Sequence, residues 1–521
     1  MSNKLKKLEP EIVFKHFGRI SQIPRCSGNE KNISNYLVEF AVEHRLEFKR
    51  DKMLNVIIKK PGTSGYEDAP TVILQGHMDM VCQKDDGINH NFDEEPLKLE
   101  IDGDFLKAKG TTLGADNGIA LAYCLALLES EDISHPPLEV VFTTQEEIGM
   151  LGAKKICGEN LSGKIFINLD SEEEGVFLAG CAGAVSIKTK LNVTFENIGG
   201  ENLIYKIDVG GLKSGHSGLD IDKGRANAIK LLGRILNDLR KYIDYRIISI
   251  NGGTQNNVIP GNSEVLICTG DAGNINLDKF NRKWNSTLTN ELKFNEPGVK
   301  VDINRMEGIS NIKCVDKAST EKVISYLLLT PNGIYSMSKE VNHLPESSVN
   351  LGIVNTMEDY IYFESSIRSS IETKKCELVD IMQASAKLIG AEIQLEGNYP
   401  GWQYKQNSPI REIFKKVYID MYEEKPKITA THCGLECGVF EKKLGNIDII
   451  SFGPDIYDAH TPKERLSTSS AKRTWELLLN VLKEIKQTRQ KGLGYNAAEE
   501  LDSMVRRRIE ERKERNSGIE D

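Results

Sequence analysis

The tetrapeptide Gly76-His77-Met78-Asp79 directly follows an apolar run at residues 72–74. Alternate side chains of an extended segment point the same way, so His77 and Asp79 should lie on one side of the chain. An imidazole with a neighbouring carboxylate is common at metal sites, where the carboxylate fixes the tautomer of the ring. A His-x-Asp pair also arises by chance, so this one is informative only together with further ligands.

A second acidic residue, Asp116, begins a stretch whose continuation at residues 119–128 is apolar and helical in character. Aspartate is favoured at helix N-termini because its carboxylate accepts backbone N–H groups, and an N-cap role would explain Asp116 by itself. The same carboxylate could instead face a cation beyond the start of the helix. The sequence leaves both roles open.

Two adjacent carboxylates, Glu146 and Glu147, follow a strand that we expect at residues 138–143. Neighbouring carboxylates at the end of a buried strand repel one another and lose solvation, so a positive partner should offset that cost. One division of roles has Glu147 binding a metal ion and Glu146 acting as general base toward a water molecule. Two glutamates on an exposed loop are the alternative.

Asp170 follows a third apolar run, residues 164–169, and His460 lies in a polar loop much later in the chain. Open α/β sheets bind their ligands beyond the carboxyl ends of the strands. His77, Glu147 and Asp170 should therefore meet at one edge of a sheet, and His460 could complete the same site. Together these side chains offer the nitrogen and oxygen ligands that a divalent cation binds.

The elements that must position these residues follow the α/β pattern, in which short apolar runs alternate with longer amphipathic ones. We expect strands at 71–74, 138–143 and 164–169, and helices at 32–43 and 116–129. The first domain should occupy residues 1–190 and be completed by 398–487. An α+β insertion with its own core is expected at 191–397, and a charged helical tail at 488–521.

The overall composition excludes several classes of protein. The chain of 521 residues has 76 acidic against 67 basic residues, a net charge of −9, which argues against nucleic acid or an anionic membrane as the main partner. It lacks an apolar run of about 18 residues and an apolar leader, so we expect a cytoplasmic protein.

The ten cysteines are dispersed without a CxxC pair, and we interpret them as reduced. GxSxG, GxxxxGK[ST] and HExxH motifs are missing, which removes the simplest serine-hydrolase, nucleotide-binding and single-zinc protease interpretations.

Taken in order, the polar clusters resemble the motifs of the aminoacylase and carboxypeptidase-type di-zinc metallopeptidases. The closer match is to the aminoacyl-histidine dipeptidases, also called the peptidase D group, and it extends from about residue 5 to 487. The segments that carry the resemblance are 75–81, 113–118, 146–147, 170, 212–218, 252–260, 432–438 and 458–460. The resemblance implies an α/β catalytic domain with a mixed sheet and helices on both faces, and an inserted α+β lid domain.

Carried over by position, the resemblance implies a site for two zinc ions with Asp116 as the bridging ligand. One ion would also bind His77 and Asp170, and the other Glu147 and His460. Manganese or cobalt accept the same set of ligands, so the sequence does not decide the metal. The family also implies a homodimer.

The resemblance further implies that Asp79 orients the metal-binding imidazole and that Glu146 is the general base for a water held between the ions. The peptide bond that follows the bridging aspartate, Asp116-Asn117, is expected to be cis. Glu436, in the segment His432-Cys-Gly-Leu-Glu-Cys-Gly438, receives no assigned role.

Four residues are implied to contact the substrate: His216, Asn257, Arg368 and Gly434. The planar guanidinium of Arg368 suits a free C-terminal carboxylate, although a salt bridge on the surface of the lid would also explain it. The function implied is the metal-dependent hydrolysis of short peptides, with Xaa-His dipeptides the favoured class. An N-acyl amino acid amidohydrolase or a tripeptidase is the near alternative, and a non-catalytic binding protein on the same fold is the more distant one.

Overall fold

The computed structural model describes residues 5–197, 202–270, 276–307 and 313–485. Contacts within the chain separate it into two units. Unit 1 comprises Met1–Gly180, Tyr404–Ala430 and Leu435–Asp521, and unit 2 comprises Cys181–Gln403 and Thr431–Gly434. The charged helical tail predicted at 488–521 lies outside the described residues.

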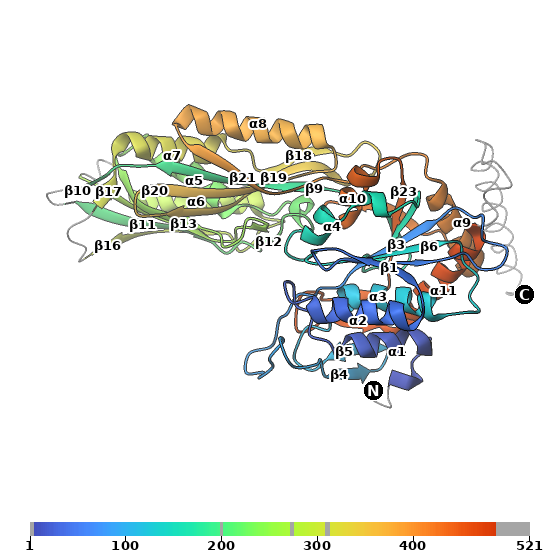
Figure 1. Ribbon diagram of the computed structural model, residues 1–521. Coiled ribbons are helices and arrows are strands. Elements are labelled where there is room, and N and C mark those ends of the chain that lie inside the picture. The colour runs from blue at the N-terminus through green and yellow to red at the C-terminus, as the bar shows by residue number, and fades with distance from the viewer. Residues whose placement is uncertain (1–4, 198–201, 271–275, 308–312, 486–521) are drawn as a thin grey trace, which may run out of the picture. The chain divides into compact units, whose positions relative to one another are not determined.

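Unit 1 contains a mixed eight-stranded sheet with the strand order β1-β2-β6-β3-β7-β23-β8-β22 (Figure 1). The central strands β6, β3, β7 and β23 run parallel, whereas β2 pairs with β1 and β6 in the antiparallel sense. A smaller sheet has the order β24-β25-β5-β4. The strands of the large sheet are β1 (Glu47–Arg50), β2 (Val56–Lys60), β3 (Val72–His77), β6 (Leu138–Thr143), β7 (Ile165–Asn168), β8 (Val176–Cys181), β22 (Lys427–Thr431) and β23 (Asp448–Ser451), and those of the small one are β4 (Leu99–Asp102), β5 (Phe105–Ala108), β24 (Ile456–Tyr457) and β25 (Arg465–Ser467).

Helices cover both faces of the large sheet. Successive side chains of β7 point to opposite faces: Ile167 joins the core that contains α1, α2 and α3, and Phe166 contacts Phe440 of α10 with ring centroids 4.9 Å apart. Figure 1 shows α2 and α3 on one side of the sheet and α4 and α10 on the other. The helices of this unit are α1 (Glu11–Ile20), α2 (Lys31–Glu43), α3 (Ala115–Glu129), α4 (Leu151–Lys155), α9 (Pro409–Tyr422), α10 (Glu436–Leu444) and α11 (Thr468–Glu484).

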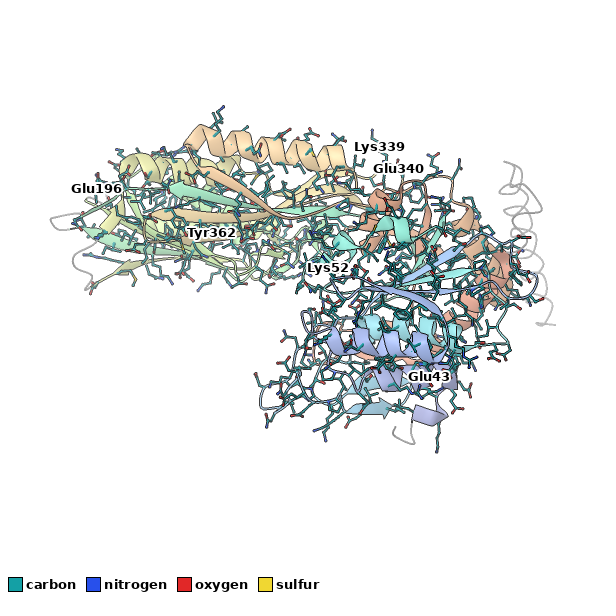
Figure 2. All side chains as sticks on the ribbon, viewed as in Figure 1. Glu43, Lys52, Glu196, Lys339, Glu340 and Tyr362 are labelled. Carbon is teal, nitrogen blue, oxygen red and sulfur yellow. A yellow bond between two sulfur atoms is a disulfide. The ribbon has the colours of Figure 1, made fainter. Side chains whose placement is uncertain are left out.

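Helices α2 and α3 differ in how much of their surface is buried, and their sequences reflect this difference. In α2, Leu37 and Ala41 face the core, and Glu43 projects into solvent (Figure 2), so this helix is amphipathic. In α3, the residues from Ala115 to Leu128 are all buried, which requires an apolar side chain at almost every position. The exceptions are the polar residues at its beginning, which are part of the site described below.

Unit 2 contains a nine-stranded sheet whose main path is β16-β11-β15-β13-β19-β20-β9-β21, with β18 paired to β19. Four helices share one hydrophobic core with this sheet. The helices are α5 (Ala228–Leu239), α6 (Leu277–Leu292), α7 (Lys317–Leu329) and α8 (Glu372–Ile389). The strands are β9 (Gly183–Asn192), β11 (Leu203–Gly210), β13 (Arg246–Gly252), β15 (Ser263–Thr269), β16 (Lys300–Met306), β18 (Gly333–Met337), β19 (Pro345–Thr356), β20 (Tyr360–Ser369) and β21 (Glu392–Tyr399), with two short pairs, β10 (Phe195–Asn197) with β17 (Lys313–Val315) and β12 (Gly215–His216) with β14 (Val258–Ile259). The predicted fold class, an α/β domain with a mixed sheet and an α+β insertion, is confirmed.

The expectation that every cysteine is reduced is wrong. The structure contains disulfides between Cys26 and Cys82 and between Cys268 and Cys314. The first two cysteines are 56 positions apart in the chain, and a β-bridge between Cys26 and Met80 brings their segments together, with the two Cα atoms 5.7 Å apart. Since that pairing is created by folding, cysteine spacing alone could not reveal it.

Within the described ranges we find no helix long and apolar enough to span a membrane.

Candidate metal centre

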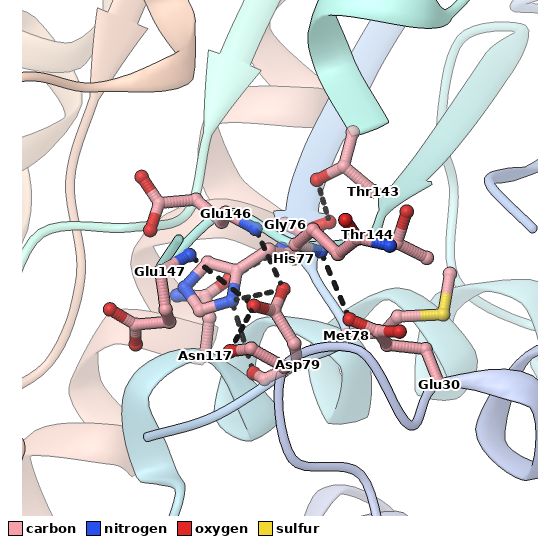
Figure 3. A network of polar contacts seen from close by, with 12 residues as sticks. Glu30, Gly76, His77, Met78, Asp79, Asn117, Thr143, Thr144, Glu146 and Glu147 are labelled. Atoms are coloured by element: carbon pink, nitrogen blue, oxygen red, sulfur yellow. Dashed lines mark hydrogen bonds and ion pairs between the residues drawn. The ribbon is translucent and has the colours of Figure 1, made fainter. Parts of the chain in front are cut away.

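The site lies at the carboxyl ends of the central strands of unit 1 (Figure 3). His77 is the last residue of β3, Glu147 follows β6, and Asp170 follows β7. Asp116 comes from the beginning of α3, and His460 from the loop between β24 and β25. In three groups of residues, one potential ligand atom from each member lies within 4.8 Å of those of the others. Two of these groups are His77 with Asp116 and Asp170, and Asp116 with Glu147 and His460. The structure therefore brings together all five residues that the sequence suggested as metal ligands.

The carboxylate of Asp116 lies between two imidazoles. Its Oδ1 is 3.0 Å from Nε2 of His77, and its Oδ2 is 2.9 Å from Nε2 of His460. A second carboxylate approaches each ring, with Asp170 Oδ1 3.4 Å from the His77 nitrogen and Glu147 Oε2 3.1 Å from that of His460. This arrangement favours the ligand role over the N-cap role for Asp116, because both of its oxygens point at the histidines.

The electrostatics of these residues require a positive charge. Burial would raise the pKa of Asp116, but hydrogen bonds with His460 and His77 outweigh it and hold that pKa below its usual range. Hydrogen bonds with Asp116 and Glu147 raise the pKa of His460 to about 11. Burial, followed by the charge of Asp116, raises the pKa of Glu147. A cation bound by these carboxylates would supply the positive charge that offsets their burial.

The donor set fits a pair of divalent cations. It consists of imidazole nitrogens and carboxylate oxygens, which zinc, manganese and cobalt all accept. Oε1 of Glu147 is buried and has no hydrogen-bond partner among the described residues, so a ligand atom is left over at the site. Buried polar atoms are nearly always paired, which indicates that this oxygen has a partner that is not a protein atom.

Asp79 contacts both the imidazole of His77 and the loop that carries the two glutamates. Its Oδ1 is 3.5 Å from Nδ1 of the imidazole, and the backbone N–H groups of Glu146 and Glu147 donate to its two oxygens at 3.0 and 3.3 Å (Figure 3). Burial would raise the pKa of Asp79, but the hydrogen bond and charge of His77, together with hydrogen bonds from the backbone of Glu146 and from Ser27, outweigh it and lower that pKa. One ionised carboxylate thus orients the imidazole and the loop that carries both glutamates.

Distances alone do not separate the roles of the two glutamates, because Glu146 also forms a potential ligand group with His77 and Glu147. The contact of Glu147 with His460 separates them, since Glu146 has no such contact among the described residues. Burial raises the pKa of Glu146 well above its usual range, and the charges of Asp170 and Glu147 act in the same direction. A carboxylate with an increased proton affinity suits a general base.

Asn117 links three of the ligand-bearing segments, a role that the sequence did not reveal. Its Oδ1 accepts the backbone N–H of His77 at 3.2 Å, and its Nδ2 donates to the carbonyl of Leu169 at 2.9 Å. The peptide bond between Asp116 and Asn117 is cis, as the family resemblance implied. The only sequence signal for this role was the adjacency of Asn117 to the acidic residue.

Glu436, which had no role assigned from sequence, is a buried member of a polar layer below the ligands. Its Oε2 accepts hydrogen bonds from Gln75 Nε2 at 2.5 Å and from Thr143 Oγ1 at 2.6 Å. Asn168 Nδ2 in turn donates to Gln75 Oε1 at 2.6 Å. Burial raises the pKa of Glu436 to about 8. This layer joins β6, β3 and β7 near their carboxyl ends, a few positions before the residues that we assign as metal ligands.

The four residues implied to contact substrate all lie in unit 2 and are linked to one another. Arg368 is buried, and its Nε donates to Ser217 Oγ at 3.4 Å and its Nη1 to Tyr399 Oη at 3.5 Å. Ser217 is the neighbour of His216, and its backbone N–H donates to the carbonyl of Asn257 at 2.8 Å. A Cβ on Gly434 would lie 2.6 Å from the ring of Tyr399, so the backbone closely approaches this tyrosine.

Arg368 is buried, which argues against the alternative that it only forms a salt bridge on the surface of the insertion. No acidic side chain forms an ion pair with Arg368 within the part of the chain that the structure describes. A salt bridge on the surface of the insertion therefore does not explain this residue. A buried guanidinium without a counter-ion favours an anionic ligand.

His432, beside this cluster, should make stability depend on pH. Burial, followed by the positive charge of Arg368, lowers its pKa to about 3, and its Nε2 lies 2.7 Å from Ser348 Oγ. The unfolded chain binds this proton first as the pH falls below about 6.5, so the free energy of unfolding should decrease by up to about 1.4 kcal/mol per pH unit.

Replacing His432 by Gln keeps a hydrogen-bonding side chain but removes the titration. The free energy of unfolding, measured by chemical denaturation between pH 7 and pH 4.5, should decrease less steeply in H432Q than in the parent, by up to about one proton's contribution of 1.4 kcal/mol per pH unit. Equal slopes in the two proteins would show that His432 can be protonated in the folded state.

Comparison with known proteins gives consistent matches over most of the chain. A sequence model of the peptidase family M20/M25/M40 matches residues 73–484. The cytosol non-specific dipeptidase of Escherichia coli K12 is 37% identical over 484 residues, which cover 93% of this chain and 99% of that protein. The crystal structure of aminoacylhistidine dipeptidase from Vibrio alginolyticus has a TM-score of 0.84 at 36% identity and covers 92% of this chain and 98% of that one. Aminopeptidase PepT from Bacillus cereus, 16% identical with a TM-score of 0.54 over 92% of this chain and 99% of that one, shares the fold.

Proposed function

Because the chain belongs to the peptidase family M20/M25/M40, we propose that it is a dipeptidase that uses two metal ions held in unit 1. The family membership agrees with the resemblance seen in the sequence motifs. The observation that carries the two-metal proposal is the position of Asp116, whose two oxygens face the imidazoles of His77 and His460. A carboxylate placed in this way can serve two cations at once. His77 and Asp170 would complete the ligands of one ion, and Glu147 and His460 those of the other.

A bound pair of cations would polarise the peptide carbonyl and make a water molecule easier to deprotonate. Glu146 accepts the proton of the attacking water on its carboxylate and then donates it to the leaving amine. Asp79 stays ionised and keeps the imidazole of His77 in one orientation, since its pKa is lowered. A proton acceptor beside the ligands argues against a protein that only binds peptides.

We propose dipeptides as substrates, and Xaa-His dipeptides as the favoured class. The names of the two relatives that match nearly the whole chain support this, one being a non-specific dipeptidase and the other an aminoacylhistidine dipeptidase. Arg368 would bind the C-terminal carboxylate of the peptide, in agreement with its burial and its lack of an ion-pair partner among the described residues. His216, Asn257 and Gly434 would contact the same substrate.

A panel of substrates tests this proposal. The full-length protein, loaded with zinc, should hydrolyse Xaa-His dipeptides with a higher kcat/KM than the corresponding tripeptides or N-acetyl amino acids. Preference for N-acetyl amino acids would identify an amidohydrolase, and preference for tripeptides a tripeptidase. Hydrolysis of none of the three classes by metal-loaded protein would favour the binding protein.

The proposal also includes the native metal, the oligomeric state and the cellular location. We expect zinc to be the native metal, which metal analysis of protein purified without added metal would test against manganese and cobalt. We also expect a homodimer, to be tested by light scattering. A cytoplasmic location is supported by the name of the E. coli relative and is testable by cell fractionation.

A further inference from the structure

We propose that Glu464 is a positioning residue that holds the segment 113–116 in the one conformation in which Asp116 can face both metal ions. Among the described residues, the carboxylate of Glu464 accepts its hydrogen bonds from the backbone of this segment, so its role would be to position a ligand rather than to bind metal or substrate. The inference rests on the proposed function in one respect only, namely that the site binds a pair of cations.

The carboxylate of Glu464 accepts four consecutive backbone N–H groups. Its Oε2 accepts those of Leu113 at 2.8 Å and Gly114 at 2.9 Å, and its Oε1 accepts those of Ala115 at 2.7 Å and Asp116 at 3.3 Å. Its exposed fraction is only 2%, so water does not compete for these bonds. Two oxygens with two lone-pair positions each match four donors, which an ionised carboxylate provides and an amide does not.

The segment is held from its other side by Arg25. Nη2 of this buried arginine donates to the carbonyl of Gly114, and Nη1 donates to the carbonyls of Met78 and Asp79, each at 3.0 Å. Gly114 has φ of +64°, and a Cβ there would lie 2.5 Å from Nη2 of Arg25. The position therefore needs glycine, both for its backbone conformation and for the close approach of the guanidinium.

The conformation that Glu464 stabilises is not that of an ordinary helix start. Asp116 has φ of −79° and ψ of 103°, outside the helical region, and in this conformation its carboxylate faces the two imidazoles. Glu464 is also four positions after His460, so one residue fixes the segments of two ligands relative to each other. A loss of its hydrogen bonds should loosen both segments together.

Electrostatics alone would disfavour a carboxylate at this position. Burial raises the pKa of Glu464, and the nearby charge of Asp116 acts in the same direction, whereas the backbone N–H groups lower it. Placing a further negative charge beside an acidic site is costly unless its hydrogen bonds offset the loss of solvation. The four N–H donors offset part of that cost, and the geometry they fix explains why an acid is present.

Zinc titration without substrate tests the role of Glu464, with Glu139 as a matched control. Glu139 is equally buried and accepts the backbone N–H groups of Ser162 at 2.8 Å and Gly163 at 3.0 Å, but it lies near the opposite end of β6. We expect E464Q to bind Zn²⁺ about 10- to 100-fold more weakly than the parent, as is typical when a residue that orients a ligand is changed. The E139Q variant should bind Zn²⁺ with the affinity of the parent.

The outcomes separate this inference from the proposed function. A folded E464Q that binds two Zn²⁺ ions with the parent's affinity would overturn it, as would equal losses of affinity in E464Q and E139Q. If thermal unfolding shows that E464Q does not fold, E464D carries the test, because its shorter carboxylate must still weaken zinc binding. If the parent binds zinc but hydrolyses no dipeptide, the function fails and the role of Glu464 can still be measured.

Discussion

Replacing Glu146 by Gln should lower kcat for dipeptide hydrolysis by about 10²- to 10⁴-fold, the usual contribution of a general acid-base residue. The amide is almost the same size as the carboxylate but cannot accept the proton of the attacking water. The backbone N–H of Glu146, which donates to Asp79, is unaffected by the change. Steady-state kinetics and metal analysis on the same preparation should therefore show a loss of turnover with an unchanged metal content.

The interpretation depends on a control for general loss of stability. E139Q changes a buried glutamate of the same unit that lies away from the ligands, so it reports what a structural loss would do, and it should keep its turnover if metal is in excess. A Glu146→Gln protein that retains its metal and hydrolyses dipeptides as fast as the parent would show that another group accepts the proton.

Replacing Asp116 by Asn should remove both metal ions together. The carboxylate of Asp116 contributes one oxygen toward His77 and the other toward His460, at 3.0 and 2.9 Å, and a neutral amide offers a single weaker oxygen ligand. We expect the metal content, measured by mass spectrometry of protein dialysed against metal-free buffer, to decrease from two ions per chain to a small fraction of one. Hydrolysis should be lost in parallel.

Asp170 provides the comparison that makes this result specific. Its carboxylate contacts only His77 among the two imidazoles, with 3.4 Å between Asp170 Oδ1 and Nε2 of His77. Asp170→Asn should therefore weaken the binding of one metal ion and leave the binding of the other unchanged. If Asp116→Asn also lost only one ion, Asp116 would be a ligand of a single metal and the bridging role would be wrong.

The sequence by itself determined the type of fold and the identity of the site's side chains. Alternation of side chains along a strand and the apolar run of a buried strand are local properties, so β6 at Leu138–Thr143 could be placed correctly from its residues. The polar residues that end these strands must then meet at one edge of a parallel sheet. That is why His77, Glu147 and Asp170 could be grouped before the structure was known.

Only the tertiary structure decided what the side chains contact. Asp116 and His460 are 344 positions apart, and no local pattern distinguishes an N-cap aspartate from one that faces two imidazoles. Glu464 and Arg25 bind backbone N–H and carbonyl groups, which all residues other than proline possess, so their partners leave no trace in the residue types. The disulfide between Cys26 and Cys82 depends likewise on segments that meet only when the chain folds. Residue types specify which chemistry is available, but the packing of distant segments decides which groups come close enough to perform it.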